Sequence, residues 1–328
     1  MRLFGLNQTS GFAERLAQHL DVGRAPHEER EFADGEFKVR PSDSVRGEHV
    51  VVCQSLAADA RMSSADKLVR LLVFCGALKD AAARHVTALV PYLAYWRKDR
   101  RTQPHDPVTT SYLARLIEAV GIDTVVTIDA HNIATFDNAF RCQKEHLEGA
   151  AAFAEHFAPV VTTASRVVVL SPDAGGEQRA RVFAGLLATR AEHAVELAFV
   201  EKHRSGGKVT GELFAGDVRD ALVIIYDDMI STGGTVARAA KAAAARGARA
   251  VHCAATHGLF SGDAIATLNA ASLASLVTMD TVDDVAERCA GLRCEWRVLD
   301  SAAVFARALT EWSGEHELAA PASALDAD

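Results

Sequence analysis

The chain has 328 residues, of which 49% are hydrophobic, so it can bury two ordinary cores and two domains are the natural expectation. A formal net charge of −8 argues against a nucleic-acid binder that is held by phosphate contacts. The six cysteines follow no zinc or disulfide pattern, no apolar stretch could span a bilayer, and the N-terminus MRLFGLNQTSGF is no signal peptide, so we expect a protein of the reducing cytoplasm.

Predicted strands and helices alternate along the whole chain. In the first half we expect strands at 49–55, 86–93 and 123–131, and helices at 64–83 and 109–120. In the second half we expect a strand and turn at 166–176, a helix at 177–191, strands at 196–202, 222–226, 249–258 and 273–281, and helices from Thr235 and Gly262. This alternation predicts an α/β fold with mostly parallel sheets flanked by helices.

The two halves look like related domains, which we divide into residues 1–148 and 149–303. A final helix at 304–312 is expected to pack back on the first domain. The tail at 313–328 is rich in Ala, Asp and Glu without a periodic apolar face, so we expect it to be disordered.

Residues 222–235, LVIIYDDMISTGGT, carry the most informative chemical pattern. The Thr-Gly-Gly-Thr turn falls between the end of a strand and the start of a helix, where free N–H groups and the helix dipole favour a phosphate. Asp227 and Asp228 would be repelled by that phosphate but are suited to binding sugar hydroxyls beside it. The pattern predicts a ribose 5-phosphate site; the alternative is an ordinary turn with two solvated aspartates.

Other polar residues follow predicted strands, where open α/β sheets bind ligands. His131 ends one strand and is either a ligand-binding or a plain surface histidine. Asp173 lies in a Gly-rich turn, where it can hold Mg²⁺ or cap the following helix, and the residues leave both interpretations open.

Two basic segments and one turn complete the set. Lys202 and Arg204 begin EKHRSGGK, which is either a solvated hairpin or a mobile loop that brings two cations to a transferring phosphoryl group. YWRKDRR at 95–101 is either a solvated charge run or a contact for a polyphosphate or nucleotide. EFADGEFKV at 31–39 predicts a hairpin with a turn at Asp-Gly.

In this order, the segments FADGE, VRGEHVVVCQS, LVPYLAYWRKDRR, TIDAH, SPDAGG, EKHR, YDDMISTGGT and ATHGLFSG closely resemble the ribose-phosphate diphosphokinase family. The resemblance runs from residue 2 to about residue 308. Simple phosphoribosyltransferases share the TGGT turn but lack a half with FADGE and RKDR. The resemblance implies two phosphoribosyltransferase-like domains related by duplication. It also implies transfer of a diphosphoryl group from Mg-ATP to the C1 hydroxyl of ribose 5-phosphate, which gives phosphoribosyl diphosphate and AMP for nucleotide biosynthesis.

The resemblance also assigns roles to matching residues. It implies that Lys202 and Arg204 stabilise the transition state and that His131 and Asp173 lie at the Mg²⁺. Ribose 5-phosphate would be bound by Asp173, Asp227, Asp228, Ser231, Thr232, Gly233, Gly234 and Thr235. ATP would be bound by Arg97, Lys98 and Asp99 and, from a neighbouring subunit, by Phe32, Asp34 and Glu36. A homo-oligomer, a dimer or higher, is therefore expected.

Three residues depart from the family pattern. Lys98 stands where many members have Gln, and Trp96 where they usually have Ala, and both fall inside the expected ATP contact. Ser231 stands where the commonest forms have Asp. The alternatives to an active enzyme are a catalytically silent regulatory homologue, to which Trp96 and Lys98 give some weight, and a phosphoribosyltransferase that consumes phosphoribosyl diphosphate.

Overall fold

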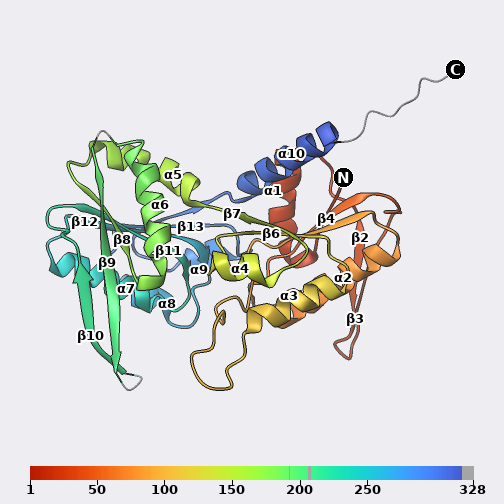
Figure 1. The fold of residues 1–328 in the computed structure, drawn as a ribbon, viewed down its shortest axis with the longest axis horizontal. Helices are drawn as coiled ribbons and strands as arrows, with labels where there is room; N and C mark the ends of the chain where they lie inside the picture. The colour runs from red at the N-terminus through yellow and green to blue at the C-terminus, as the bar shows by residue number, and fades with distance from the viewer. Residues whose placement is uncertain (192, 206–207, 320–328) are drawn as a thin grey trace.

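The computed structural model describes the backbone of residues 1–191, 193–205 and 208–319, and the side chains in these ranges except at 8, 201–212 and 313–319. Its two larger sheets are mostly parallel and flanked by helices (Figure 1), which confirms the predicted α/β fold. Within the described chain, no helix is long and apolar enough to cross a membrane. All six cysteines are free thiols, as their spacing indicated.

The first sheet has five parallel strands in the order β1-β4-β5-β6-β7. Its strands are β1 (Arg2–Gly5), β4 (His49–Cys53), β5 (His85–Leu89), β6 (Thr124–Ile128) and β7 (Gln143–Leu147). Its helices are α1 (Ser10–Leu20), α2 (Ser64–Asp80), α3 (Thr109–Ala119) and α4 (Ile133–Ala139). The centre of the sheet is apolar on both faces because helices cover both, and every residue of β6 is buried.

The second sheet has seven strands in the order β10-β9-β8-β11-β12-β13-β14, with only β10 antiparallel to its neighbour. Its strands are β8 (Val167–Ser171), β9 (Val195–Ser205), β10 (Lys208–Ala215), β11 (Leu222–Ile230), β12 (Ala250–Gly258), β13 (Ser275–Met279) and β14 (Glu295–Leu299). The helices of this half are α5 (Ala150–Thr163), α6 (Glu177–Ala188), α7 (Gly234–Ala245), α8 (Ala264–Asn269) and α9 (Val285–Cys289).

A separate two-stranded hairpin, β2 (His27–Glu31) and β3 (Phe37–Pro41), was predicted from its Asp-Gly turn and is present. At the turn, Gly35 has φ +87° and donates its N–H to the carbonyl of Phe32 at 3.0 Å. Figure 1 shows this hairpin at the side of the N-terminal half that faces away from β11.

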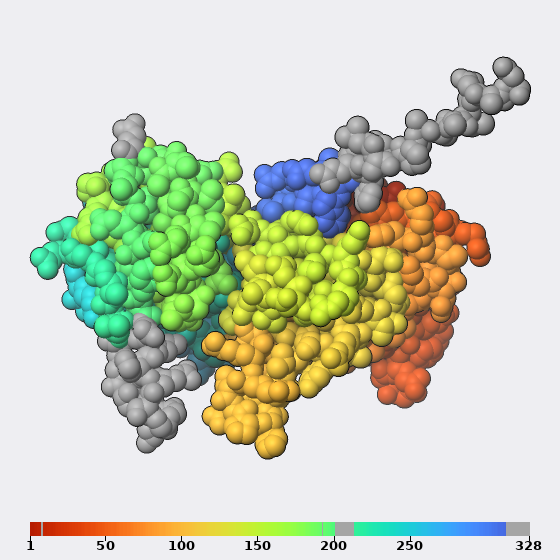
Figure 2. All heavy atoms as spheres, in the orientation of Figure 1, coloured from red at the N-terminus to blue at the C-terminus, as the bar shows by residue number. Residues whose placement is uncertain are grey.

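Helix α10 (Ala302–Ala319) runs longer than the predicted 304–312. Residues 313–319, which were expected to be disordered, continue the helix, because Glu, Leu and Ala are strong helix formers. The remainder of the predicted tail, 320–328, lies outside the described residues. Phe305 of α10 packs edge-on against Phe12 of α1, with ring centroids 5.5 Å apart. Figures 1 and 2 show α10, in blue, lying against the N-terminal half beside α1.

The two halves are also joined by polar contacts. The buried Lys67 ammonium of α2 lies 2.7 Å from Asp59 and 3.7 Å from Asp283, which follows β13. The Ser55 hydroxyl donates to the carbonyl of Thr281 at 2.6 Å, and the Arg288 guanidinium donates to the carbonyl of Ala58 at 2.6 Å. These contacts fix the carboxyl edge of the first sheet, after β4, against the C-terminal half.

Candidate active site

The two adjacent aspartates lie within a strand rather than after it. The strand was predicted to end at Tyr226, but β11 continues to Ile230 because β12 goes on pairing with it, with Asp227 opposite Ala255 and Met229 opposite His257. Asp227 and Asp228 are 7% and 3% exposed, so the alternative of two solvated aspartates is wrong. Buried carboxylates need partners, and these partners define the site.

Asp228 is paired with His131 from the other half of the molecule. Nδ1 of His131 lies 2.8 Å from Oδ2 of Asp228. Because the Asp228 hydrogen bond favours the imidazolium, the pKa of His131 is raised, although burial opposes this. Burial likewise works against ionisation of Asp228, but His131 and Arg179 outweigh it and hold the pKa of Asp228 well below its usual range.

Asp227 behaves in the opposite way. Burial and the neighbouring Asp228 charge raise its pKa well above the usual value. Oδ1 of Asp227 accepts a hydrogen bond from the backbone N–H of Asp228 at 2.9 Å. The pair therefore consists of one readily ionised carboxylate and one that holds its proton to higher pH, as expected for like charges forced together.

The loop that carries His131 is anchored by Asp129, which the sequence interpretation did not single out. Asp129 is buried, has φ +42° and accepts hydrogen bonds from the Thr256 hydroxyl and, at 3.1 Å, from the Gly149 N–H. Burial raises its pKa. Asp129 thus fixes the end of β6 against β12 of the other half.

Asp173 caps the turn before α6. Its Oδ1 accepts the N–H groups of Gly175 at 3.0 Å and Gly176 at 3.1 Å. Asp173 therefore has the capping role that one of its two sequence interpretations predicted. The same carboxylate contributes to the raised pKa of Asp227 through its negative charge, and the turn that it caps, residues 174–176, contacts β11.

The Thr-Gly-Gly-Thr turn joins β11 to α7. Gly233 has φ +72°, and a Cβ there would lie 2.9 Å from the Leu268 side chain of α8, so only glycine fits. Gly233 is the N-cap residue of α7 and, having no side chain, supplies no side-chain cap. Ser231 accepts the N–H of Ser261 at its carbonyl, and Thr232 is exposed. Gly234 and Thr235 form the first turn of α7.

The residues of the basic segment after β5, at 95–101, lie in different environments. Arg97 is exposed. Burial raises the pKa of the Tyr92 hydroxyl, and the charges of Arg97 and Asp228 have opposing effects on it. Asp99 accepts a hydrogen bond from the Asn132 amide at 2.6 Å. Lys98 forms an ion pair within the loop that follows, with its ammonium 2.5 Å from the carboxylate of Asp106.

Trp96 does not lie in a ligand contact. It is 2% exposed and stacks on Phe140 with centroids 5.4 Å apart and planes 7° apart, while Phe136 meets it edge-on. Its expected position inside the ATP contact is therefore wrong. The indole fills the core beneath α4, because Phe136 of that helix and Phe140, just after its end, surround it with aromatic rings.

Lys202 and Arg204 lie on β9, which extends to Ser205 rather than ending at Lys202. Their backbones pair with Glu212 and Val209 of β10. Their side chains lie outside the described residues.

Phe32, Asp34 and Glu36 form the exposed tip of the β2–β3 hairpin, which lies on the side of the N-terminal half away from β11 of the same chain (Figure 1). The guanidinium of Arg30 lies 5.0 Å from the Phe32 ring centroid, and Asp34 accepts the Glu36 N–H at 3.1 Å.

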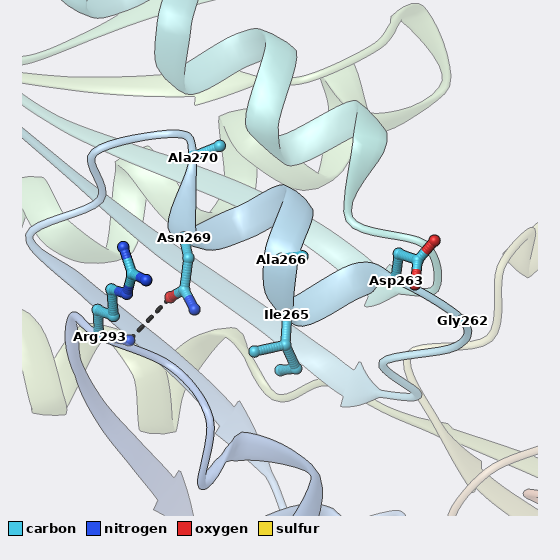
Figure 3. A pocket seen from close by; sticks show the side chains of 7 residues that line it. All are labelled: Gly262, Asp263, Ile265, Ala266, Asn269, Ala270 and Arg293. Atoms are coloured by element: carbon cyan, nitrogen blue, oxygen red, sulfur yellow. Dashed lines mark hydrogen bonds between the residues drawn. The ribbon is translucent and has the colours of Figure 1, made fainter.

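Two hollows occur in the described surface. One, of about 540 Å³, lies between α3 and α4 and includes Asp99 and Asn132 in its lining. The other, of about 530 Å³, lies beside α8 (Figure 3), where the Asn269 side chain accepts the Arg293 N–H, and contains no predicted site residue. Among residues with described side chains, no group of three or more His, Cys, Asp or Glu is arranged to hold a metal ion.

Comparisons with known proteins agree with this geometry. Residues 1–121 match the N-terminal domain of ribose phosphate pyrophosphokinase, and residues 144–285 match the phosphoribosyl transferase domain. Ribose-phosphate pyrophosphokinase 1 of Streptococcus mutans is 35% identical over 286 residues, covering 86% of this chain and 85% of that protein. Its namesake from Streptococcus pneumoniae is 35% identical over 285 residues, covering 86% and 85%.

A solved structure extends the similarity to the fold. The phosphoribosylpyrophosphate synthetase of Mycobacterium smegmatis superposes with a TM-score of 0.86 at 29% identity, covering 96% of this chain and 99% of that one. With both halves matched in order and the sheets superposed, the chain belongs to the ribose-phosphate pyrophosphokinase family.

Proposed function

We propose that this protein transfers the diphosphoryl group of Mg-ATP to the C1 hydroxyl of ribose 5-phosphate, giving phosphoribosyl diphosphate and AMP. The observation that carries the proposal is the contact between His131 of the N-terminal half and Asp228 of the C-terminal half, at 2.8 Å. It joins the strand proposed to bind the sugar to the loop after β6, whose Asn132 donates a hydrogen bond to Asp99 of the segment proposed to bind ATP. We take residues 1–148 as the ATP side and 149–303 as the ribose 5-phosphate side.

The sugar phosphate is bound by the turn after β11. The N-terminal end of α7 and the close approach allowed by Gly233 suit the 5-phosphate. Asp227 and Asp228 accept hydrogen bonds from ribose hydroxyls, with Ser231, Thr232, Gly234 and Thr235 around the phosphate. An ionised Asp228 is suited to this because a carboxylate accepts hydrogen bonds on both oxygens.

ATP lies against Arg97 and Asp99, and Lys202 and Arg204 supply positive charge as the diphosphoryl group moves. Lys98 contributes less than the sequence indicated, since Asp106 already neutralises it. Phe32, Asp34 and Glu36 serve a neighbouring subunit, in keeping with their distance from the aspartate pair. The working enzyme is then a homo-oligomer.

The residues present fit Mg²⁺ in part. Mg²⁺ is usually held by one or two carboxylates and by substrate phosphates, so the absence of a metal-holding cluster among the described side chains accords with it. Asp173 offers a carboxylate beside the aspartate pair, and the Nδ1 contact of His131 with Asp228 leaves its Nε2 edge for the metal shell. The metal neutralises charge on the triphosphate.

The alternatives are less well supported. The weight that Trp96 gave to a silent homologue is removed by its place in the aromatic core. A phosphoribosyltransferase function does not account for the N-terminal half, of which residues 1–121 match the pyrophosphokinase domain.

The reaction is tested by ³¹P NMR of purified protein with Mg-ATP and ribose 5-phosphate. We expect AMP and a sugar-linked diphosphate in equal amounts, and neither in the presence of excess chelator. ADP with a sugar-linked monophosphate would contradict diphosphoryl transfer, and no turnover by folded protein would favour the silent homologue.

The role of the β9 cations is tested by Lys202→Ala. Loss of a cation that acts on the transition state lowers kcat by roughly 100-fold or more while the melting temperature stays near that of the unaltered protein. An unchanged kcat would remove Lys202 from the proposed machinery.

A further inference from the structure

Arg179, at the third position of α6, lies at the centre of the candidate site although no pattern in the sequence singled it out. Its Nη1 lies 3.4 Å from Oδ1 of Asp228 and 3.6 Å from Oδ1 of Asp227. Its Nη2 donates to the backbone carbonyl of His131 at 3.4 Å. One guanidinium therefore contacts both carboxylates of β11 and the loop after β6, which come from different halves of the molecule.

The environment of Arg179 is dominated by negative charge. Burial lowers its pKa, but Asp228, Asp227 and Asp129 outweigh burial and raise it, so the guanidinium is a permanent cation. Its side chain is 18% exposed. Two buried carboxylates next to each other in sequence repel each other strongly. The fixed positive charge of Arg179 favours the ionised form of Asp228 against this repulsion.

We propose that Arg179 is a positioning residue: it holds the Asp228 carboxylate and the His131 loop in one arrangement, so that the sugar and ATP sides of the site are aligned. This rests on the proposed function. A role in binding the sugar phosphate directly is disfavoured, because the guanidinium is buried and already contacts two carboxylates and a carbonyl.

The chain offers a matched set of variants. Arg179→Gln removes the charge, and Arg179→Lys keeps it but cannot reach the carboxylates and the His131 carbonyl together. Arg181→Gln is the control, since Arg181 lies on the same helix, is exposed and pairs only with Glu177 at 2.9 Å among the described contacts.

We expect Arg179→Gln to lower kcat/KM for ribose 5-phosphate on the order of 100-fold, as misplacement of a reacting group does, with a smaller change in KM for ATP. Arg179→Lys should fall between, and Arg181→Gln should match the unaltered protein. Arg179→Gln activity equal to that of Arg181→Gln would overturn the proposal.

The second measurement needs no turnover. Binding of ribose 5-phosphate to each variant is measured by isothermal titration calorimetry. We expect Arg179→Gln to weaken binding by about 10-fold or more and Arg179→Lys to fall between it and the unaltered protein, which also serves if the Gln variant fails to fold. Equal affinities in the Gln and control variants would refute the positioning role even in an active enzyme. Absence of turnover in unaltered protein, with the expected loss of affinity, would refute the proposed function alone.

Discussion

At the scale of single residues, the site depends on charges that are buried and paired across the two halves. Asp227, Asp228 and His131 could be singled out because each follows an apolar run in the sequence, and the carboxyl ends of such runs meet at one edge of a parallel sheet. Arg179 could not, because Arg181 two residues later has the same chemistry and only the packing of α6 decides which one faces β11. Lys67 was equally hidden, since its burial depends on Asp59 and Asp283 from distant segments.

Asp283 gives a pH-dependent prediction. Burial raises its pKa to about 7 in spite of Lys67, whereas the ordinary value is 3.8. Between these pH values the folded protein binds the proton and the unfolded chain does not. The free energy of unfolding therefore falls as pH rises, by at most about 1.4 kcal/mol per pH unit from this group.

Asp283→Asn should flatten this dependence. In urea unfolding, the variant gains stability relative to the unaltered protein at pH 8 compared with pH 5, because Lys67 keeps its 2.7 Å contact with Asp59. Asp80→Asn, at an exposed position, is the control for loss of a surface carboxylate and should shift stability equally at pH 5 and pH 8. A gain at pH 5 as large as that at pH 8 would contradict the account.

At the scale of elements, the alternation of strands and helices was predictable from the apolar runs, and the ends of elements were not. β11 extends beyond its apolar run because β12 continues to pair with it. β9 extends further than predicted because β10 pairs antiparallel with it. Polar residues such as Asp227 are then drawn into a strand by the backbone hydrogen bonds of their neighbours. Trp96 could not be placed, because its surroundings come from α4, more than 35 residues further on.

Trp96→Ala tests that placement. Removing an indole stacked on Phe140 leaves a cavity and should lower the free energy of unfolding by about 3–5 kcal/mol, with KM for ATP unchanged in the protein that remains folded. Denaturant unfolding and steady-state kinetics measure both. Tyr112→Ala, at an exposed position of α3, should stay within about 0.5 kcal/mol. A large change in KM for ATP with little loss of stability would restore Trp96 to the nucleotide contact.

At the scale of the whole molecule, the C-terminal helix returns to the N-terminal half. Phe305 of α10 packs against Phe12 of α1, and contacts near Lys67 join the halves at another point. Such joints make the relative position of the halves part of the fold, which the active site needs because its groups come from both.

Phe305→Ala should therefore destabilise the protein as a whole. We expect a loss of about 3–5 kcal/mol in the free energy of unfolding, with both halves still unfolding in one transition. Circular dichroism during urea unfolding measures this, with the exposed Arg307→Ala as control. A Phe305→Ala protein as stable as the control would show that α10 does not join the halves energetically.

The central claim, that the carboxylates of β11 bind the sugar at the joint between the halves, is tested most directly by the steady-state kinetics of Asp228→Asn. The measurement is AMP formation at varied ribose 5-phosphate and, separately, varied ATP. Loss of a charged hydrogen-bond acceptor should raise KM for ribose 5-phosphate by about 10- to 100-fold and leave KM for ATP nearly unchanged. An effect confined to ATP, or none at all, would contradict the assignment of this site.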